Sequence, residues 1–377
     1  MMRKWISIAM AVLSLSVYAD TTNTFTRAVD NNWSNSSNWD VVPSNWTDYS
    51  ANLVFGYGNG ANYWMYNNIS GAKVASMTFT EDAAGSYSVN NNNVQFTTGN
   101  SIGDMIVNNS SYAVNFYSQA VFNWGTSGAR YVRANNGDLT FGGIALWTSN
   151  DGDPNLIFAA KAGRTITLRD TGTLNPGSTV RTLTFQGDGT GGSFSFDSTI
   201  SGAASYLHHL IIEDAATVNL NMTAGQIEDL TLSSGRVSYS KDNLSFGDII
   251  FGTTGGGANE VDFNGHDNDF NLLTIAADAE TNILNFEGTN AVTFADCSAE
   301  TWLSTLVITN FEFGVDSLRF GTDADGLTQA QKDLITVNGV SGIDLDSTGY
   351  LVPEPTTISL LVISSTVLFL IRHTRCF

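Results

Sequence analysis

Leu207-His208-His209-Leu210-Ile211-Ile212-Glu213-Asp214-Ala215-Ala216 contains the pattern that decides the fold of this chain. An apolar residue is followed three positions later by a second one and two positions after that by a third, here Leu207, Leu210 and Ile212. The last two positions have the spacing that sends both side chains to one face of a β-strand. The segment therefore predicts a short strand with one buried face.

The same pattern recurs along the chain at irregular intervals. Its central residues 183, 210, 230, 273 and 306 are separated by 27, 20, 43 and 33 positions. Units of about 20–45 residues that each bury one strand face against their neighbours are typical of a solenoid. We therefore predict an all-β protein with a β-solenoid body. Antiparallel β-sandwich domains are the alternative, because short strands with turn signals look alike in sequence. The further copies are Val74-Met77-Phe79, Val180-Leu183-Phe185, Ile227-Leu230-Leu232, Phe270-Leu273-Ile275 and Leu303-Leu306-Ile308.

One short helix is predicted near the end of the body. Residues 326–335 place Leu327, Ala330, Leu334 and Ile335 on one face of a helix. Asp325 precedes this segment and is predicted to help cap its N-terminus.

The body is strongly acidic but carries few charges. The chain has 16 Lys and Arg and 36 Asp and Glu. Four of the basic residues and one acidic residue lie in the two end segments: Arg3, Lys4, Arg372, Arg375 and Glu354. Residues 20–353 therefore carry 12 basic against 35 acidic side chains, a net charge of −23. An acidic surface repels phosphate backbones, which argues against nucleic acid as a partner. Charged residues are 14% of the chain, and the uncharged polar residues that replace them favour strands and turns.

The first 19 residues are predicted to be a secretory signal peptide. Arg3 and Lys4 form a basic start, residues 5–17 are apolar, and Val17-Tyr18-Ala19 supplies small residues at a cleavage site. Cleavage after Ala19 would leave Asp20 as the first residue. An uncleaved anchor is the alternative, but the apolar stretch is shorter than the roughly 20 residues that span a membrane.

The last residues, 352–377, combine three features. Pro353-Glu354-Pro355 is followed by an apolar run at 358–371 and then by Arg372 and Arg375. The prolines prevent a helix from continuing upstream. The arginines predict a single membrane segment with its C-terminus in the cytoplasm and the body on the other side.

This tripartite end resembles the PEP-CTERM sorting signal of exported bacterial proteins. The resemblance implies that a membrane-embedded exosortase recognises Pro353, Glu354 and Pro355 and removes the tail, with Arg372 and Arg375 as the basic stop. It extends into residues 316–351, through Asp316-Ser317-Leu318-Arg319-Phe320-Gly321-Thr322 and Gly349-Tyr350-Leu351. A plain tail anchor is the alternative.

The start of the body has a second resemblance. Trp33-Ser34-Asn35-Ser36-Ser37-Asn38-Trp39-Asp40, with Leu53-Val54-Phe55-Gly56 downstream, is similar to the opening of autotransporter-associated β-strand repeat proteins, whose passengers are β-helices. The resemblance implies that residues 20–315 form a β-repeat body.

Three short motifs that suggest chemistry lack the context that the chemistry needs. Residues 99–103 match a nucleophile elbow, but strand formers follow instead of a helix. Residues 187–192 match a dinucleotide fingerprint, yet the next residues alternate like a strand, which predicts a glycine-rich corner. In the segment 323–326 the calcium-loop ligand positions are wrong. We predict no catalytic residue, no metal and no cofactor.

The remaining candidates are aromatic and sulfur side chains. Trp33, Trp39 and Trp46 could form a glycan-stacking platform, or they could cap the end of the solenoid. Cys297 is predicted to be a small buried side chain, and His208 and His209 lie within a strand pattern.

These observations predict an exported, non-enzymatic protein of the cell envelope or extracellular matrix. Its partners would be signal peptidase, an exosortase-type enzyme, the membrane through the C-terminal segment, and extracellular polysaccharide. The alternatives are a polysaccharide-binding lectin and a lyase-like β-helix enzyme, which needs clustered acidic ligands and a basic residue on one strand face.

Overall fold

The computed structural model describes the body of the chain and leaves several connecting segments and both ends undescribed. The described residues are 21–47, 51–56, 63–96, 103–124, 128–148, 154–169, 182–197, 206–221, 226–242, 245–252, 257–276 and 281–353.

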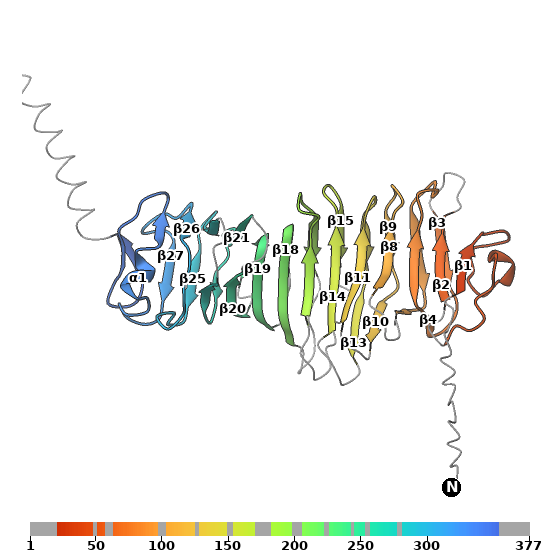
Figure 1. Cartoon of the computed structure of the whole chain (residues 1–377), viewed down its shortest axis with the longest axis horizontal. Helices are drawn as coiled ribbons and strands as arrows, with labels where there is room; N and C mark the ends of the chain where they lie inside the picture. Colours follow the sequence, from red (N-terminus) through yellow and green to blue (C-terminus); the bar gives the residue numbers. More distant parts are fainter. Residues whose placement is uncertain are drawn as a thin grey trace, which may run out of the picture.

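The body is a β-solenoid, as the sequence predicts. Its coils lie side by side along the long axis of an elongated molecule, with the first strand near one end and the last near the other (Figure 1). Ladder A is one set of parallel strands, each paired with its counterpart in the next coil. It consists of β1 (Thr21–Phe25), β2 (Ala51–Phe55), β5 (Ser76–Phe79), β8 (Gly103–Asn108), β11 (Gly128–Ala134), β14 (Pro154–Ala160), β16 (Thr182–Gln186), β18 (Tyr206–Leu220), β19 (Gln226–Tyr239), β20 (Ser245–Phe251) and β23 (Leu273–Ile275).

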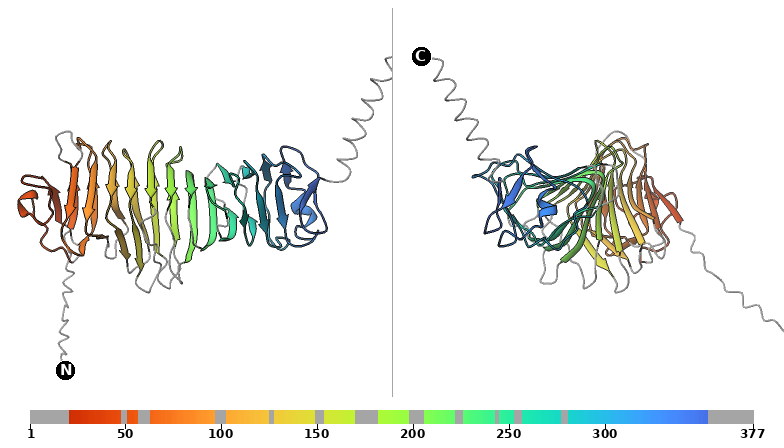
Figure 2. Two further views of the ribbon diagram at one scale, coloured as in Figure 1. Left: turned by 180° about the vertical axis from the view of Figure 1, so that it is seen from behind. Right: turned by 60° about the vertical axis from the view of Figure 1, so that its left-hand side comes forward.

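Ladder B lies on a second side of the coil, and the views in Figure 2 show strands on more than one face. The long strands β18 and β19 belong to both ladders, because they bend around the corner between them. In β18 the bend is a break in register between Glu213 and Ala216, where Asp214 and Ala215 have positive φ angles of 55° and 62°. The other strands of ladder B are β3 (Tyr63–Asn67), β6 (Tyr87–Asn91), β9 (Val114–Phe116), β12 (Leu139–Phe141), β15 (Thr165–Leu168), β17 (Ser193–Phe196), β21 (Ala258–Asp262), β24 (Thr281–Asn285), β26 (Leu306–Thr309) and β28 (Ile335–Val337).

Two short sets of strands form further sides of the coils. One contains β4 (Ala72–Val74), β7 (Val94–Phe96), β10 (Ala120–Trp124) and β13 (Ile144–Thr148), and the other contains β22 (Asn268–Asp269), β25 (Ala291–Phe294) and β27 (Ser317–Phe320). All pairings within these sets and the two ladders are parallel. The antiparallel sandwich alternative is therefore wrong for the described body. The hairpin of β29 (Ile343–Leu345) and β30 (Leu351–Pro353) is antiparallel.

The core is a set of inward rows that run along the solenoid axis. In ladder B each inward residue pairs with an inward residue of the next coil, so equivalent side chains stack about 4.8 Å apart. Phenylalanines use this spacing for ring stacking: the centroids of Phe116 and Phe141 are 4.9 Å apart and their planes differ by 12°. One continuous row is buried over its whole length and contains Tyr63, Tyr87, Val114, Leu139, Ile166, Phe194, Val218, Val237, Val261, Leu284, Ile308 and Val337.

Buried asparagines explain the Asn-rich composition. Asn259 donates to Asn282 (3.0 Å), and Asn282 donates to Ser304 (2.9 Å) in the coil after it. Asn108 donates to the carbonyls of Tyr112 (2.9 Å) and Asp138 (3.0 Å). A side-chain amide carries both a donor and an acceptor, so it satisfies buried backbone groups without burying a charge.

The N-terminal end of the solenoid is closed by the segment after β1. Backbone bonds join Thr26 N to Asn38 O (2.7 Å) and Asp40 N to Thr24 O (3.0 Å), so this segment runs antiparallel along the outer edge of β1. A short 3₁₀ turn, η1 (Ser36–Asn38), precedes it. Covering an edge strand removes a template for pairing with another chain.

The C-terminal end has its own cap. Phe320 N bonds to Gly349 O, and Arg319 forms an antiparallel bridge to Tyr350, so the last hairpin covers the edge of β27. Residues 316–351 thus continue the solenoid through β27 and β28 and then close it.

The predicted helix is present but shorter, as α1 (Gln329–Lys332). Thr328 caps it through a capping box with Gln331, so the prediction that Asp325 caps it is wrong. Ala330 is exposed, and Ile335 is the first residue of β28. The buried residue is Gln331, whose amide donates to the carbonyls of Cys297 and Glu300, both at 2.8 Å. Apolar periodicity finds this helix but not its bounds, because a buried amide holds it.

The repeat pattern locates ladder A correctly over most of its length. Leu183, Leu210 and Leu230 are register partners, and Ile249 connects Leu230 to Leu273. The 43-residue interval therefore contains two coils. Leu306 is an exception, because it lies in β26 of ladder B.

Truncating one stacked ring tests the core. Phe141→Ala should destabilise the protein by about 3–5 kcal/mol, because it removes a fully buried ring that contacts Phe116 and Phe158. Thr140→Ala, on the outer face of the same strand, should change stability by about 0.5 kcal/mol or less. Chemical denaturation of both variants measures the difference, and equal effects would contradict the inward assignment.

Candidate functional site

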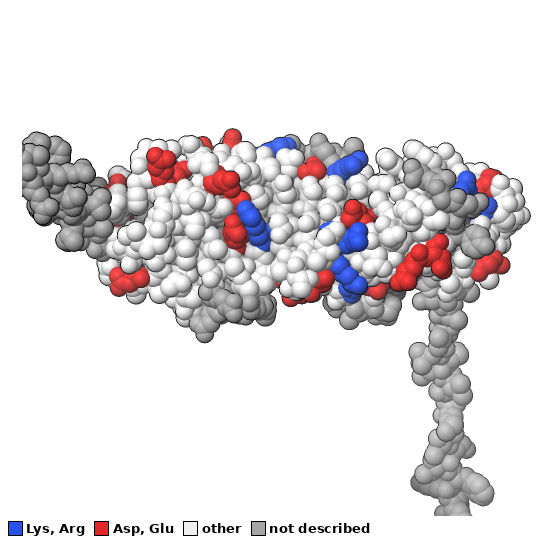
Figure 3. Space-filling model, turned by 90° about the horizontal axis from the view of Figure 1, so that it is seen from above, with Lys and Arg blue, Asp and Glu red and all other residues white. Residues whose placement is uncertain are grey.

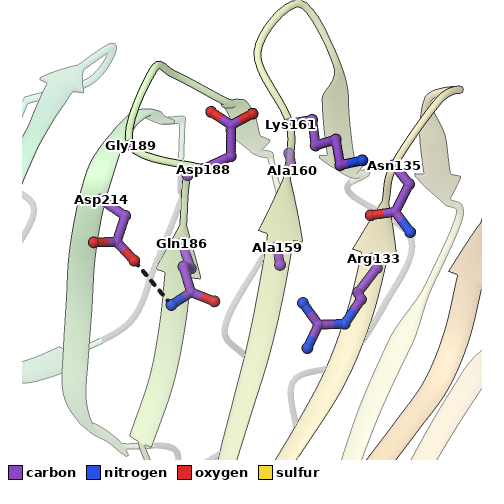
Figure 4. A pocket seen from close by; sticks show the side chains of 10 residues that line it. Arg133, Asn135, Ala159, Ala160, Lys161, Gln186, Asp188, Gly189 and Asp214 are labelled. Atoms are coloured by element: carbon purple, nitrogen blue, oxygen red, sulfur yellow. Dashed lines mark hydrogen bonds between the residues drawn. The ribbon is translucent and has the colours of Figure 1, made fainter.

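A polar groove of about 410 Å³ lies on the outer surface at the corner between ladders A and B. Its lining residues come from four successive coils, at the ends of β11, β14 and β16 and at the bend of β18 (Figure 4). They are Arg133, Asn135, Ala159, Ala160, Lys161, Gln186, Gly187, Asp188, Gly189 and Asp214.

The groove exists because a small residue interrupts an outward row of larger ones. Arg133, Ala159 and Gln186 are register partners in adjacent strands, and Glu213 continues the row. Their side chains stand about 4.8 Å apart along the axis, so the methyl group of Ala159 leaves a hollow between an arginine and a glutamine. Ala159 therefore forms the floor.

Hydrogen bonds hold both walls in place. Arg133 Nε donates to Asp104 Oδ1 at 2.6 Å, while its terminal nitrogens point over the floor (Figure 4). Gln186 Nε2 donates to Glu213 Oε1 (3.1 Å) and to Asp214 Oδ2 (3.0 Å). This pairing fixes the amide orientation, so the Gln186 carbonyl oxygen faces Ala159 (Figure 4).

The rim consists of two turns. Asp188 accepts hydrogen bonds from Thr190 N (3.0 Å), Thr190 Oγ1 (2.7 Å) and Ala162 N (3.2 Å), and these bonds, first those from Thr190, lower the pKa of its carboxyl group. Lys161 is exposed at the start of the neighbouring turn. Gly187 has no side chain because a Cβ there would lie 2.0 Å from the Asp214 carbonyl oxygen.

The charged form of Glu213, which lies behind the Gln186 wall of the groove, is disfavoured in the folded protein. Burial raises the pKa of this half-buried carboxyl group, the adjacent Asp214 raises it further, and the hydrogen bond from Gln186 opposes the shift. Glu213 therefore binds a proton more readily in the folded state than in the unfolded chain.

The groove offers hydrogen-bond donors and acceptors. Arg133 and Lys161 supply donors, Gln186 and Asp214 supply acceptors, and the four charged lining residues cancel. Among the described residues, no group of three or more His, Cys, Asp or Glu side chains is arranged to hold a metal ion. The groove thus has the chemistry of a site for polar ligands.

A second surface feature is a pair of exposed aromatic rings. Trp64 on β3 and Tyr117 after β9 stack with centroids 5.8 Å apart and planes within 10°. Their exposed fractions are 48% and 56%, respectively. Ser88, the register partner of Trp64 on β6, is small, which lets the rings meet across that strand.

A smaller hollow of about 340 Å³ lies near the C-terminal end. It is lined by Arg319 and Asp323 among others, and it also includes the edges of Phe270 and Phe294. Phe270 and Phe294 stack on each other and belong to the core, so this hollow is a gap above packed rings.

The tryptophans proposed for glycan stacking lie in the N-terminal cap. Trp33 and Trp39 are 0% and 5% exposed, and Trp39 Nε1 donates to Trp33 O at 2.9 Å. Trp46 is partly buried and stacks on Trp33 at 5.9 Å. Trp33 and Trp39 pack against Phe55 and Phe25 and present no free face to a sugar, so the three tryptophans do not form an exposed platform, and Trp33 and Trp39 serve to cap the solenoid.

The predicted processing residues lie at the ends of the described region or beyond it. Pro353 ends β30, where it pairs with Ile343. The rest lie outside the described residues: Ala19, Asp20, Glu354, Pro355, Arg372 and Arg375.

The predicted buried thiol is confirmed. Cys297 is fully buried, its sulfur accepts from Leu273 N at 3.3 Å, and burial raises its pKa to about 12. His209 contacts Asp229 (3.0 Å), and His266 lies in a turn with Asp242 (2.8 Å), so each ring has a structural partner. The motif at 187–192 forms the corner between β16 and β17.

Sequence reasoning missed Arg133, Ala159 and Gln186. They are separated by 26 and 27 residues, and only the register of the coils makes them neighbours. A search for an outward Ala between two long polar residues at the coil period would have found them.

Comparisons with protein-family models, with curated proteins and with solved structures found no match to this chain. Within the part of the chain that the structure describes, no helix has the length and apolarity needed to cross a membrane.

Replacing Glu213 tests the electrostatics of the wall. A raised folded-state pKa means that Glu213 favours folding at low pH and that this contribution is lost as pH rises from its ordinary value of 4.5 through the folded-state pKa. Glu213→Gln should therefore stabilise the protein at pH 7 by up to about 1 kcal/mol, and the gain should vanish below pH 4.5.

Asp188→Asn is the matched control with the opposite sign. The pKa of Asp188 is lowered, so its contribution is present above the ordinary aspartate pKa and is lost as pH falls through the folded-state pKa. Its removal should not stabilise the protein at pH 7. Thermal unfolding at several pH values measures both variants, and a gain that is independent of pH for Glu213→Gln would contradict the assignment.

Proposed function

We propose that this protein is an exported, non-enzymatic structural or adhesive component of the cell envelope or extracellular matrix. A signal peptide at 1–19 directs export, and the C-terminal segment 352–377 holds the protein in the membrane until an exosortase-type enzyme removes the tail. The β-solenoid is the delivered part.

The observation that carries this proposal is where the described fold begins and ends. The solenoid extends from Thr21 in β1 to Pro353 in β30, and the product predicted from the two processing sites is residues 20–353. Both caps lie inside this interval, so processing at the two sites would leave every strand that the structure describes in the product. The agreement supports delivery of a complete folded rod.

The hydrogen bonds of the groove support a non-enzymatic role. Arg133 is paired with Asp104, and both oxygens of Asp188 accept bonds that hold the rim turns. A lyase-like enzyme would need a base that is free to take a proton from its substrate. In this groove Arg133, Asp188 and Asp214 are engaged in bonds within the protein, and Lys161 is an exposed side chain at the rim.

A lectin is the second candidate, and Trp64 with Tyr117 favours it. Two exposed parallel rings on a sparsely charged surface can stack on the apolar face of a sugar ring. Figure 3 shows how few charged side chains interrupt one face of the body. An adhesive solenoid and a lectin differ only in whether glycan is the partner.

The test is the intact mass of the cell-surface form from the native host, with and without Glu354→Ala. We expect a species that begins at Asp20 and ends close to Pro353, and we expect the variant to keep its tail, because the recognition motif is changed.

Glu81→Ala is the control, since Glu81 is an exposed glutamate outside the signal. It should be processed like the unchanged protein. A surface form that keeps its full tail in all three cases would mean a plain anchor, and a protein that keeps residues 1–19 and stays in the cytoplasm would overturn the proposal.

A further inference from the structure

We propose that the groove over Ala159 binds a sugar unit of a neutral glycan. This inference rests on the proposed adhesive role and names its ligand class. The site is the hollow between Arg133 and Gln186, with Lys161, Asp188 and Asp214 at its rim.

The wall chemistry matches hydroxyl groups. Across the floor, the guanidinium of Arg133 offers donors while the fixed carbonyl oxygen of Gln186 offers an acceptor (Figure 4). A ligand must therefore accept on one side and donate on the other. A hydroxyl group does both, and a sugar ring carries several of them at adjacent positions.

The charge balance selects a neutral glycan. Arg133 and Lys161 are matched by Asp188 and Asp214 among the lining residues, and Glu213 and Asp104 stand directly behind them. A uronate or phosphate group would meet these carboxylates at short range, and like charges repel most strongly where solvent screening is weakest. Charged side chains bound to one another can still hydrogen-bond to neutral hydroxyls.

The walls are preorganised. Asp104 holds Arg133, and Glu213 and Asp214 hold Gln186, each through bonds of 2.6–3.1 Å. Gly187 allows the turn backbone to approach Asp214 closely, which keeps the corner narrow. Little side-chain freedom remains to be lost on binding, which favours affinity from few contacts. The volume of about 410 Å³ lies within the range of small-ligand sites.

The experiment measures retention of the purified full-length chain in gels that contain a soluble neutral glucan or mannan, with a polyuronate gel for comparison. Ala159→Gln fills the hollow with a side chain of the same size as its row neighbour, and it should weaken binding to the neutral glycan at least tenfold. Ala129→Gln makes the same substitution on the same face, at the other end of β11, and should leave binding unchanged.

Arg133→Gln is a second variant, which keeps a donor for Asp104 but removes the guanidinium; it should also weaken binding. Thermal unfolding of all variants shows whether they fold.

Three results would overturn the inference: stronger retention in the polyuronate gel than in the neutral gels, no retention in the glucan gel and none in the mannan gel, or binding to the neutral glycan that survives Ala159→Gln. Binding that is lost only in Trp64→Ala would move the site to the aromatic pair and leave the adhesive role intact, whereas the proposed export is judged separately from the mass of the surface form.

Discussion

The register between successive coils is the constraint on which this structure depends. Every strand in the two ladders pairs in parallel with its counterpart in the next coil, so equivalent positions lie about 4.8 Å apart. Inside, this distance lets phenylalanines stack and asparagine amides bond from coil to coil. Outside, it places like residues side by side. Because like charges at that distance repel, a stacked fold favours uncharged polar side chains, which accounts for the low content of charged residues.

The outer rows show how the remaining charges are accommodated. Arg236 forms an ion pair with Asp262 in the next coil at 2.6 Å. His209 likewise lies 3.0 Å from Asp229, its register partner in the next coil. At Glu213 burial raises the carboxyl pKa, and the adjacent Asp214 raises it further. Neutral side chains also join adjacent coils: Thr184 Oγ1 donates a hydrogen bond to Asn155 Oδ1 at 2.9 Å. Each coil is therefore tied to the next by side chains as well as by backbone.

The sequence predicts what is local and periodic, and it fails where a feature depends on register. The spacing of Leu183, Leu210 and Leu230 locates ladder A because the inward period is carried by apolar residues. The coil at Ile249 carries the same apolar pattern, at Phe246, Ile249 and Phe251, so the 43-residue interval contains a copy that the prediction overlooked. The groove was not predicted, since Arg133, Ala159 and Gln186 become neighbours only after three coils are aligned at the coil period. For Trp33 the sequence favours the cap over a glycan platform, and its complete burial agrees with the cap.

The capped ends direct any partner to the sides of the rod. Residues 38–40 cover the edge of β1, Asn31 and Trp33 hydrogen-bond to Tyr66 of β3, and Gly349 and Tyr350 cover β27. A partner that added a strand at these edges would first have to displace such segments. On the sides of the rod, two surface features lie where the stacking is interrupted: the groove opened by the small side chain of Ala159, and the ring pair of Trp64 and Tyr117, which meet over Ser88. Because the outward rows are regular, a single small residue in a row changes the local shape of the surface, as Ala159 does between Arg133 and Gln186.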